Sequence, residues 1–450
     1  MARVSTIGNA TVIVYDDSPI LATDPWFGGE DSAYFGSWNL SHEIPIQQKQ
    51  DILNSEYIWF SHGHPDHLNS SSLNQLRGRK ILLPDHVGAR IAKTLMNDQF
   101  DVSVLPDRKW VNLSPNTNIM CITTCIQDAI LLISVYDRLF INLNDSGARH
   151  CTNFIRTIAK EYRCAYLLSL SGYGDADMIN FFDESGKFVV PPAKNNIYVG
   201  EQLGHLAKSL RADAVIPFSS HHQYQRTDSL WAQEYVTPLH DYENGFPGDI
   251  EFIPPFVDIE CPSGDYQSIS PKQIEIVPKF PEYYGDSWSD ELDLQDRVAI
   301  DKYFQRKELI RDRIGYIHLV VGGKTHTVSL NPRSKKGISF ELPRNSLMSA
   351  IDMEIFDDLL IGNFMKTTLH NMRSLYESQF AFSLTKYADN GRAETEEEVR
   401  QYLAEYRRRA GRQYIYETFL DYSKSLVNRV LTNKGSKIRR KVRSIYYRIR

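Results

Sequence analysis

Four residues of the kinds that bind metal ions lie within one short stretch of this 450-residue chain. They follow the pattern His-x-His-x-Asp-His and are His62, His64, Asp66 and His67. The hydrophobic residues 57–60 directly before them predict a buried strand, so the four side chains gather at its carboxyl end. Imidazole and carboxylate ligands suit zinc, iron or manganese better than calcium or magnesium. The spacing therefore predicts a transition-metal site whose loop directs two ligands at each of two neighbouring ions.

The same loop resembles the signature of the metallo-β-lactamase superfamily. Upstream, residues 20–27 (Ile-Leu-Ala-Thr-Asp-Pro-Trp-Phe) resemble the strand and Asp-Pro-Trp element of that fold. The resemblance covers about residues 1–260 and implies an α/β fold, the αββα sandwich, in which two sheets pack between outer helices. Residues 24–40 and 57–68 are also similar to the oxygenase part of CMP-N-acetylneuraminate hydroxylases. The Rieske iron–sulfur module of those hydroxylases has no counterpart, because the chain has no Cys-x-His … Cys-x-x-His arrangement.

Two further apolar runs end in residues able to complete such a site. One run ends in Asn144 and Asp145, and a strand-end carboxylate is what two neighbouring ions need as a bridge. The superfamily resemblance implies that Asp145 is this bridge, with Asn144 as the alternative. The other run is followed by His221 and His222. The resemblance implies that one of these two histidines, with His222 slightly favoured, completes the second metal position.

One histidine that the superfamily usually supplies has no counterpart. No histidine lies between His86 and His150, where that ligand is expected. In the corresponding stretch Cys125, Gln127 and Asp128 are the side chains able to substitute. An oxygen ligand would favour iron or manganese, and a cysteine would favour zinc. The alternatives are therefore a substitute ligand, a weakly occupied position or a single metal ion.

Two residues are candidates for contact with a small-molecule substrate. Tyr173 lies in a loop, Ser-Gly-Tyr-Gly-Asp, that follows a predicted strand, and its ring could stack on a sugar or base. The alternative for this loop is a plain glycine turn. Arg226 follows the two histidines, and a guanidinium can bind a phosphate or a carboxylate through two hydrogen bonds.

Composition limits the class of protein. The chain is 42% hydrophobic and 24% charged, as soluble globular proteins are. It has no apolar run of the length that a transmembrane helix needs, and its first residues lack the apolar centre of a signal peptide. The five cysteines are scattered and predict neither a disulfide framework nor a cysteine-rich metal site. These features predict a cytoplasmic protein.

The end of the chain differs in charge from the rest. Residues 432–450 carry eight Lys or Arg and no acid, so the remaining chain has a net charge of −5 − 8 = −13. An acidic body disfavours broad nucleic-acid binding. The basic tail could contact an anionic membrane or an acidic partner, which would place the protein at the membrane periphery. A solvated helix end is the alternative interpretation.

Short strands separated by turns dominate residues 1–260. The expected strands are 11–15, 20–23, 57–60, 81–84, 102–105, 110–113, 118–124, 129–135, 139–143, 165–170 and 214–218. Helices are expected at 73–76, 87–96, 151–163 and 198–210, with Asp85 as the N-cap of the second. This alternation fits a sandwich with outer helices.

Three regions are expected beyond residue 260. Residues 261–297 are rich in Pro, Ser, Asp and Tyr and predict a linker along the surface. Residues 298–375 predict a small α/β region with a helix at 298–312 and strands at 316–321, 325–330 and 338–342, which loosely resembles the sterol-carrier-like appendages of some superfamily members. Residues 376–450 predict a helical region with a basic tail, in which one or two amphipathic helices break near Gly411.

Three functions follow from these residues. The favoured one is a hydrolase in which two divalent ions, zinc or iron, activate water against an ester, amide or phosphodiester, with Asp66 orienting the nucleophile or accepting its proton. The hydroxylase resemblance implies the second: a diiron oxygenase acting on a nucleotide sugar or related glycan precursor, with electrons from a separate ferredoxin or reductase. The third is a scaffold or binding protein with a degenerate metal site.

Overall fold

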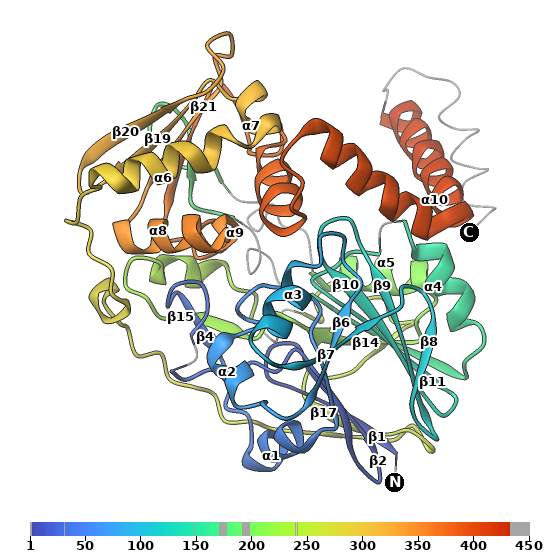
Figure 1. Cartoon of the computed structure of the whole chain (residues 1–450). Coiled ribbons are helices and arrows are strands. Elements are labelled where there is room, and N and C mark those ends of the chain that lie inside the picture. The colour runs from blue at the N-terminus through green and yellow to red at the C-terminus, as the bar shows by residue number, and fades with distance from the viewer. Residues whose placement is uncertain are drawn as a thin grey trace.

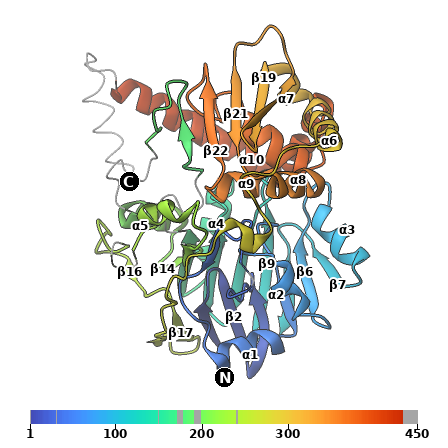
Figure 2. The same cartoon turned by 90° about the vertical axis from the view of Figure 1, so that its left-hand side faces the viewer.

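The computed structural model describes residues 2–30, 32–148, 150–170, 178–190, 199–238, 240 and 242–432, with side chains up to residue 420. Two sheets form the lower part of the molecule in Figure 1, and a second, smaller α/β unit lies above them. The turned view in Figure 2 shows the same division, with the N-terminus at the base of the sandwich.

Two mixed sheets build the lower part. The first has the strand order β18-β17-β1-β2-β3-β5-β6-β7 and the second β16-β14-β12-β11-β10-β9-β8. The first sheet consists of β1 (Arg3–Ile7), β2 (Thr11–Asp16), β3 (Ser18–Thr23), β5 (Tyr57–Trp59), β6 (Lys80–Pro84), β7 (Asp101–Leu105), β17 (Val257–Glu260) and β18 (Tyr266–Ser268). The second consists of β8 (Trp110–Ser114), β9 (Thr117–Thr123), β10 (Ala129–Val135), β11 (Arg138–Asn144), β12 (Cys164–Leu170), β14 (Ala214–Phe218) and β16 (Glu251–Phe252).

Apolar side chains cover both faces of the central strands. Val12, Val14, Leu131 and Phe140 belong to the core between the two sheets. Helices α1 (Ile46–Asn54), α2 (Ser70–Asn74) and α3 (Arg90–Asn97) cover the outer face of the first sheet, and α4 (Thr152–Ala159) and α5 (Val199–Leu210) cover that of the second. Strands β10 and β11 are buried along their whole length for this reason. The αββα sandwich predicted from the sequence is confirmed.

The second unit has its own sheet and core. Its strand order is β13-β22-β21-β19-β20, with β13 (Phe181–Phe182), β19 (Tyr316–Val321), β20 (Lys324–Ser329), β21 (Gly337–Glu341) and β22 (Lys366–His370). Helices α6 (Leu294–Gln305), α7 (Glu308–Arg313), α8 (Arg344–Met353) and α9 (Phe356–Ile361) pack around it. The single helix expected at 298–312 is thus two helices.

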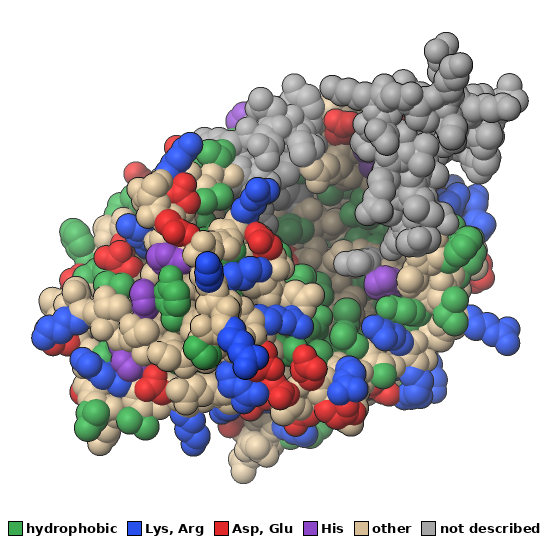
Figure 3. All heavy atoms as spheres, turned by 90° about the horizontal axis from the view of Figure 1, so that it is seen from above, with side chains coloured by type: hydrophobic (Ala, Val, Ile, Leu, Met, Phe, Trp, Pro, Cys, Tyr) green, Lys and Arg blue, Asp and Glu red, His purple; other side chains and the backbone are tan. Residues whose placement is uncertain are grey.

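Acidic and basic side chains are interspersed on the face of the molecule that is seen from above (Figure 3).

The expected boundaries between regions are crossed by pairing strands. Strand β18 lies in the segment expected to be a linker, yet it pairs with β17 at the edge of the first sheet. Strand β13, from the first 260 residues, pairs with β22 of the second unit. Between β18 and α6 the chain runs along the sandwich up to the second unit and includes the short helix η4 (Pro281–Tyr284) (Figure 1). The two units are therefore joined by more than one connection.

The helical region begins with a π-helical segment, Phe382–Asn390, and continues as α10 (Glu396–Thr432). Gly411 has the left-handed φ of 56° inside α10, so the predicted break there is confirmed. Asp85 is not a helix cap, because α3 begins only at Arg90, after Ala89. Among the described helices, none combines the length and the apolar character that crossing a membrane requires.

Candidate metal centre

Strand ends of both sheets meet at one edge of the sandwich. The metal-ligand loop follows β5, Asp145 follows β11, and Ser219 follows β14. Three non-glycine residues here, Asp24, Asn144 and Ser219, have left-handed φ angles of 40°, 41° and 59°. Each such residue costs on the order of 1–3 kcal/mol, and residues of this kind concentrate at functional sites. The strand ends are thus bent to bring polar side chains together.

Two groups of possible metal ligands share Asp145. His62, His64 and Asp145 each offer one atom within 4.8 Å of the others, and so do Asp66, His67 and Asp145. Nε2 of His62 faces Nδ1 of His64 at 2.8 Å. Oδ2 of Asp145 lies 3.9 Å from Nε2 of His62 and 3.4 Å from Nε2 of His67. The geometry is that of two adjoining positions with one carboxylate between them.

Hydrogen bonds hold the carboxylates of this cluster in place. The hydroxyl of Tyr34 donates to Oδ1 of Asp66 at 2.5 Å, and the amide of Asn9 donates to Oδ2 at 2.9 Å. The hydroxyl of Ser219 donates to Asp145 and lies 3.3 Å from Nε2 of His67. Asp66 and Asp145 are therefore oriented before any ligand arrives.

Negative charge is crowded in the cluster. Burial and the nearby charge of Asp145 raise the pKa of Asp128 well above its ordinary value, and burial also raises the pKa of Asp66. Burial alone would lower the pKa of His67, but the carboxylates Asp66 and Asp145 together hold this pKa well above its ordinary value. Buried carboxylates beside imidazoles are a donor set for divalent transition metals, whose charge would offset this repulsion. The residues present thus fit one or two divalent ions.

No family model matches the chain. It is 27% identical over 143 residues to the cytidine monophosphate-N-acetylneuraminic acid hydroxylase of Asterias rubens, which is 30% of this chain and 21% of that protein. The chain is 31% identical over 103 residues to the Cricetulus griseus enzyme of the same name, and this match covers 22% of this chain and 18% of that protein. To the inactive human protein of that name it is 25% identical over 131 residues, 27% of this chain and 26% of that protein. The chain matches about a quarter or less of the length of these relatives.

The chain also aligns with solved structures of other proteins. An isothiocyanate hydrolase from Delia radicum gut bacteria aligns over 60% of this chain and 99% of its own, with a TM-score of 0.36 and 13% identity. The CmlA β-hydroxylase aligns over 57% of this chain and 53% of its own, with a TM-score of 0.36 and 14% identity. The fold class itself rests on the sheet order and on the His-x-His-x-Asp-His loop at the sandwich edge. The sandwich has the metallo-β-lactamase fold.

Of the candidates for the missing ligand of the metallo-β-lactamase fold, Asp128 comes nearest to the cluster. Its Oδ1 lies 3.4 Å from Nδ1 of His62, the ring nitrogen that faces away from His64. Cys125 and Gln127 contact α10 instead. The amide of Gln127 donates to the hydroxyl of Tyr402, that hydroxyl donates to the carbonyl of Cys125, and the Cys125 side chain packs against the apolar cluster that includes Tyr402. The side-chain amide of Asn144 donates to the carbonyl of Ala129. Asp128 thus lies behind His62, as an outer partner.

The two ligand groups include neither His221 nor His222, so the role of one of these histidines as a metal ligand stays a prediction. Ser219 occupies the strand-end position that faces Asp145 and His67. Strand β15 (His222–Tyr224) pairs with β4 (Trp38–Leu40), which stacks the His222 ring on Trp38 at 3.4 Å between centroids. Burial lowers the pKa of His222 to about 3.

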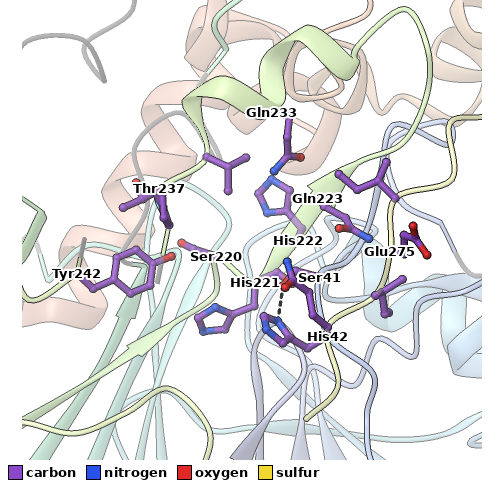
Figure 4. Close-up of a pocket in the computed structure, with 15 residues that line it drawn as sticks. Ser41, His42, Ser220, His221, His222, Gln223, Gln233, Thr237, Tyr242 and Glu275 are labelled. Atoms are coloured by element: carbon purple, nitrogen blue, oxygen red, sulfur yellow. Dashed lines mark hydrogen bonds between the residues drawn. The ribbon is translucent and has the colours of Figure 1, made fainter. Parts of the chain in front are cut away.

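His221 and His222 line a cavity of about 740 Å³, together with Ser41, His42, Gln223 and Gln233 (Figure 4). Within Figure 4 the hydroxyl of Ser41 and Nδ1 of His42 form a hydrogen bond of 2.9 Å. The lining residues include no member of the two ligand groups, so the cavity adjoins the metal cluster without sharing its side chains.

Arg226, predicted to contact an anionic substrate, is buried and paired with acidic side chains, so its contact with a substrate stays a prediction. Its side chain is 0% exposed, and it forms ion pairs with Asp228 at 2.8 Å and Asp286 at 2.7 Å. Its third partner is the carbonyl of Phe35, to which Nη1 donates at 2.9 Å. These partners occupy the guanidinium and leave no face for an anion. Tyr173, the other substrate candidate, lies outside the described residues.

Sequence reasoning missed two residues that reach the cluster from the second unit. Oδ2 of Asp357, on α9, lies 2.9 Å from Nε2 of His64, and Lys386 donates to the same oxygen at 2.6 Å. Burial alone would raise the pKa of Asp357, but Lys386 and His64 hold it below its ordinary value. The acidic pair Asp357-Asp358 at a helix start was the available signal, and it is also an ordinary sign of a helix N-terminus.

Proposed function

We propose that this chain is a metal-dependent hydrolase with a dinuclear centre. His62, His64 and Asp145 would hold one ion, and Asp66, His67 and Asp145 the other. The observation that carries the proposal is the position of Asp145, which belongs to both ligand groups and whose Oδ2 faces His62 and His67. The substrate class is an ester, an amide or a phosphodiester.

Two divalent ions bound there supply a water of lowered pKa and stabilise negative charge that develops on the substrate. The chain's own residues set the geometry. Tyr34 and Asn9 donate to both oxygens of Asp66 and so fix the direction in which that carboxylate faces. Asp66 orients the attacking water in this proposal. Ser219 donates to Asp145 from the end of β14 and would hold this carboxylate in the orientation in which it could serve both ions.

A diiron oxygenase is the second candidate, and two observations favour it. The cluster places the carboxylates Asp66, Asp128 and Asp145 beside its imidazoles, and oxygen-rich donor sets suit iron and manganese. The similar curated proteins carry hydroxylase names. In this proposal a separate ferredoxin or reductase supplies electrons, and a nucleotide sugar or related glycan precursor is the substrate.

Elemental analysis of the protein, purified without added metal, together with an ultraviolet–visible spectrum, tests these proposals. The hydrolase predicts one or two zinc ions per chain, no visible colour, and loss of ester or phosphodiester hydrolysis after chelation that added zinc restores. Near two irons with a charge-transfer band would replace it by the oxygenase. Protein that holds no metal, even after incubation with zinc or iron, would leave only the scaffold interpretation.

We also propose that the basic segment contacts an anionic membrane surface. Residues 433–450 lie outside the described residues, and α10, which precedes them, exposes Ile415, Tyr416 and Phe419. Apolar side chains beside a run of Lys and Arg fit the surface of an anionic bilayer. Deleting residues 433–450 should abolish co-sedimentation with phosphatidylserine vesicles and leave metal content unchanged. Equal sedimentation of the full chain with neutral vesicles would contradict the proposal.

A further inference from the structure

Each histidine of the cluster has one ring nitrogen that faces the cluster and another that lies near a buried carboxylate, and for His64 this second contact is a hydrogen bond. Nδ1 of His62 forms a hydrogen bond of 2.8 Å with the hydroxyl of Ser61 and lies 3.4 Å from Asp128, and Nδ1 of His67 lies 3.1 Å from Asp24. His64 is turned the other way: its Nδ1 faces His62, and its Nε2 lies 2.9 Å from Asp357. A carboxylate behind a metal-binding histidine holds the N–H of the outer nitrogen, which leaves the lone pair of the inner nitrogen free for the metal.

The partner of His64 differs from the other two in origin. Asp24 and Asp128 belong to the sandwich, whereas Asp357 lies on α9 of the second unit, 293 residues from His64 in the chain. Figures 1 and 2 show α9 on the side of the second unit that faces the sandwich. The Asp357 side chain is 4% exposed, so the contact is made inside the molecule rather than on its surface.

A second residue of the same unit holds Asp357. The ammonium of Lys386 donates to Oδ2 of Asp357 at 2.6 Å. Lys386 lies within the π-helical segment, and such segments are rare and occur frequently at functional sites. The second unit therefore presents an ordered pair, Asp357 and Lys386, to a histidine of the metal loop.

We propose that Asp357 is a positioning residue of the metal centre, which holds the proton of His64 on Nε2 so that Nδ1 faces the metal position, and that Lys386 keeps Asp357 in place. The role in metal binding rests on the dinuclear centre proposed above, whereas the position of the proton on His64 does not. The second unit then completes the metal centre.

Variants at Asp357 test this with two readouts. Asp357→Ala removes the acceptor, Asp357→Asn keeps its size and a neutral carbonyl acceptor, and Asp352→Ala changes an exposed acid of α8 as the control. Zinc affinity, measured by competition with a chelator, should fall about 10–100-fold in Asp357→Ala, the range for loss of an outer carboxylate, and less in Asp357→Asn. The control should bind zinc as the wild type does.

Nitrogen-15 spectra of histidine-labelled, metal-free protein give the second readout. His64, assigned by the signal missing in His64→Gln, should carry its proton on Nε2 in the wild type and lose that preference in Asp357→Ala. Unchanged proton position and unchanged zinc affinity would overturn the inference. Should Asp357→Ala not fold, Asp357→Leu, which is close to Asp in size and has no acceptor, makes the same comparison. A wild type that binds no zinc would refute the dinuclear centre, while the spectra would still decide whether Asp357 sets the proton on His64.

Discussion

We expect Asp145→Ala to purify with almost no bound metal and to lose at least about 100-fold in activity. Loss of an outer partner already costs 10–100-fold in metal affinity or activity, and a shared ligand contributes to both positions. Oδ2 of Asp145 faces His62 on one side and His67 on the other, so the substitution opens both ligand groups at once. Metal content per chain, measured beside thermal unfolding of the same samples, checks the prediction.

Two comparisons make the result specific to Asp145. His64→Ala should remove the ion held with His62 and leave the one held by Asp66 and His67, because those two residues form their own group with Asp145. Asp137→Ala, at the other end of the same strand and half-exposed, should leave metal content unchanged. Full metal content in Asp145→Ala would mean that the cluster does not share a carboxylate.

The ligand loop and Asp145 could be predicted because their signal is local. Both follow apolar runs that form buried strands, and side chains at the ends of central strands meet at one edge of a sandwich. Ser219 could not be predicted in the same way. Its left-handed backbone, with φ of 59°, and the pairing of β15 with β4 turn His222 towards Trp38. The spacing of His221 and His222 in the sequence predicts neither this turn nor this strand pairing.

Other features could not be predicted because the residues that form them are far apart in the sequence. Asp357 reaches His64 through the packing of two units, which no short pattern records. The same holds for the boundaries: β13 and β18 cross them because their pairing partners, β22 and β17, decide where they lie. Strands such as β19 and β20 were predicted well because their alternation and their turn, Gly322-Gly323, are adjacent in sequence.

The sequence predicts that Arg226 binds an anion because a sequence does not reveal burial, whereas the burial and ion pairs of Arg226 in the structure predict a large effect on stability. Arg226→Met should lower the free energy of unfolding by about 3–5 kcal/mol, because it leaves the paired carboxylates Asp228 and Asp286 without their counter-charge. Arg226 also stacks on Phe364 of the second unit at 4.0 Å, so the loss should loosen the junction of the two units. Urea denaturation followed by fluorescence measures the change.

Matched variants separate this structural role from substrate binding. Arg226→Lys keeps the charge but not the two-pronged geometry on Asp228, so it should recover only part of the lost stability. Arg163→Met removes an arginine that is 64% exposed and should change the free energy of unfolding by less than about 1 kcal/mol. If Arg226→Met instead unfolds like the wild type but binds inorganic phosphate or a carboxylate ligand more weakly, the guanidinium serves an anionic substrate after all. The full burial of Arg226 and its three partners favour the loss of stability.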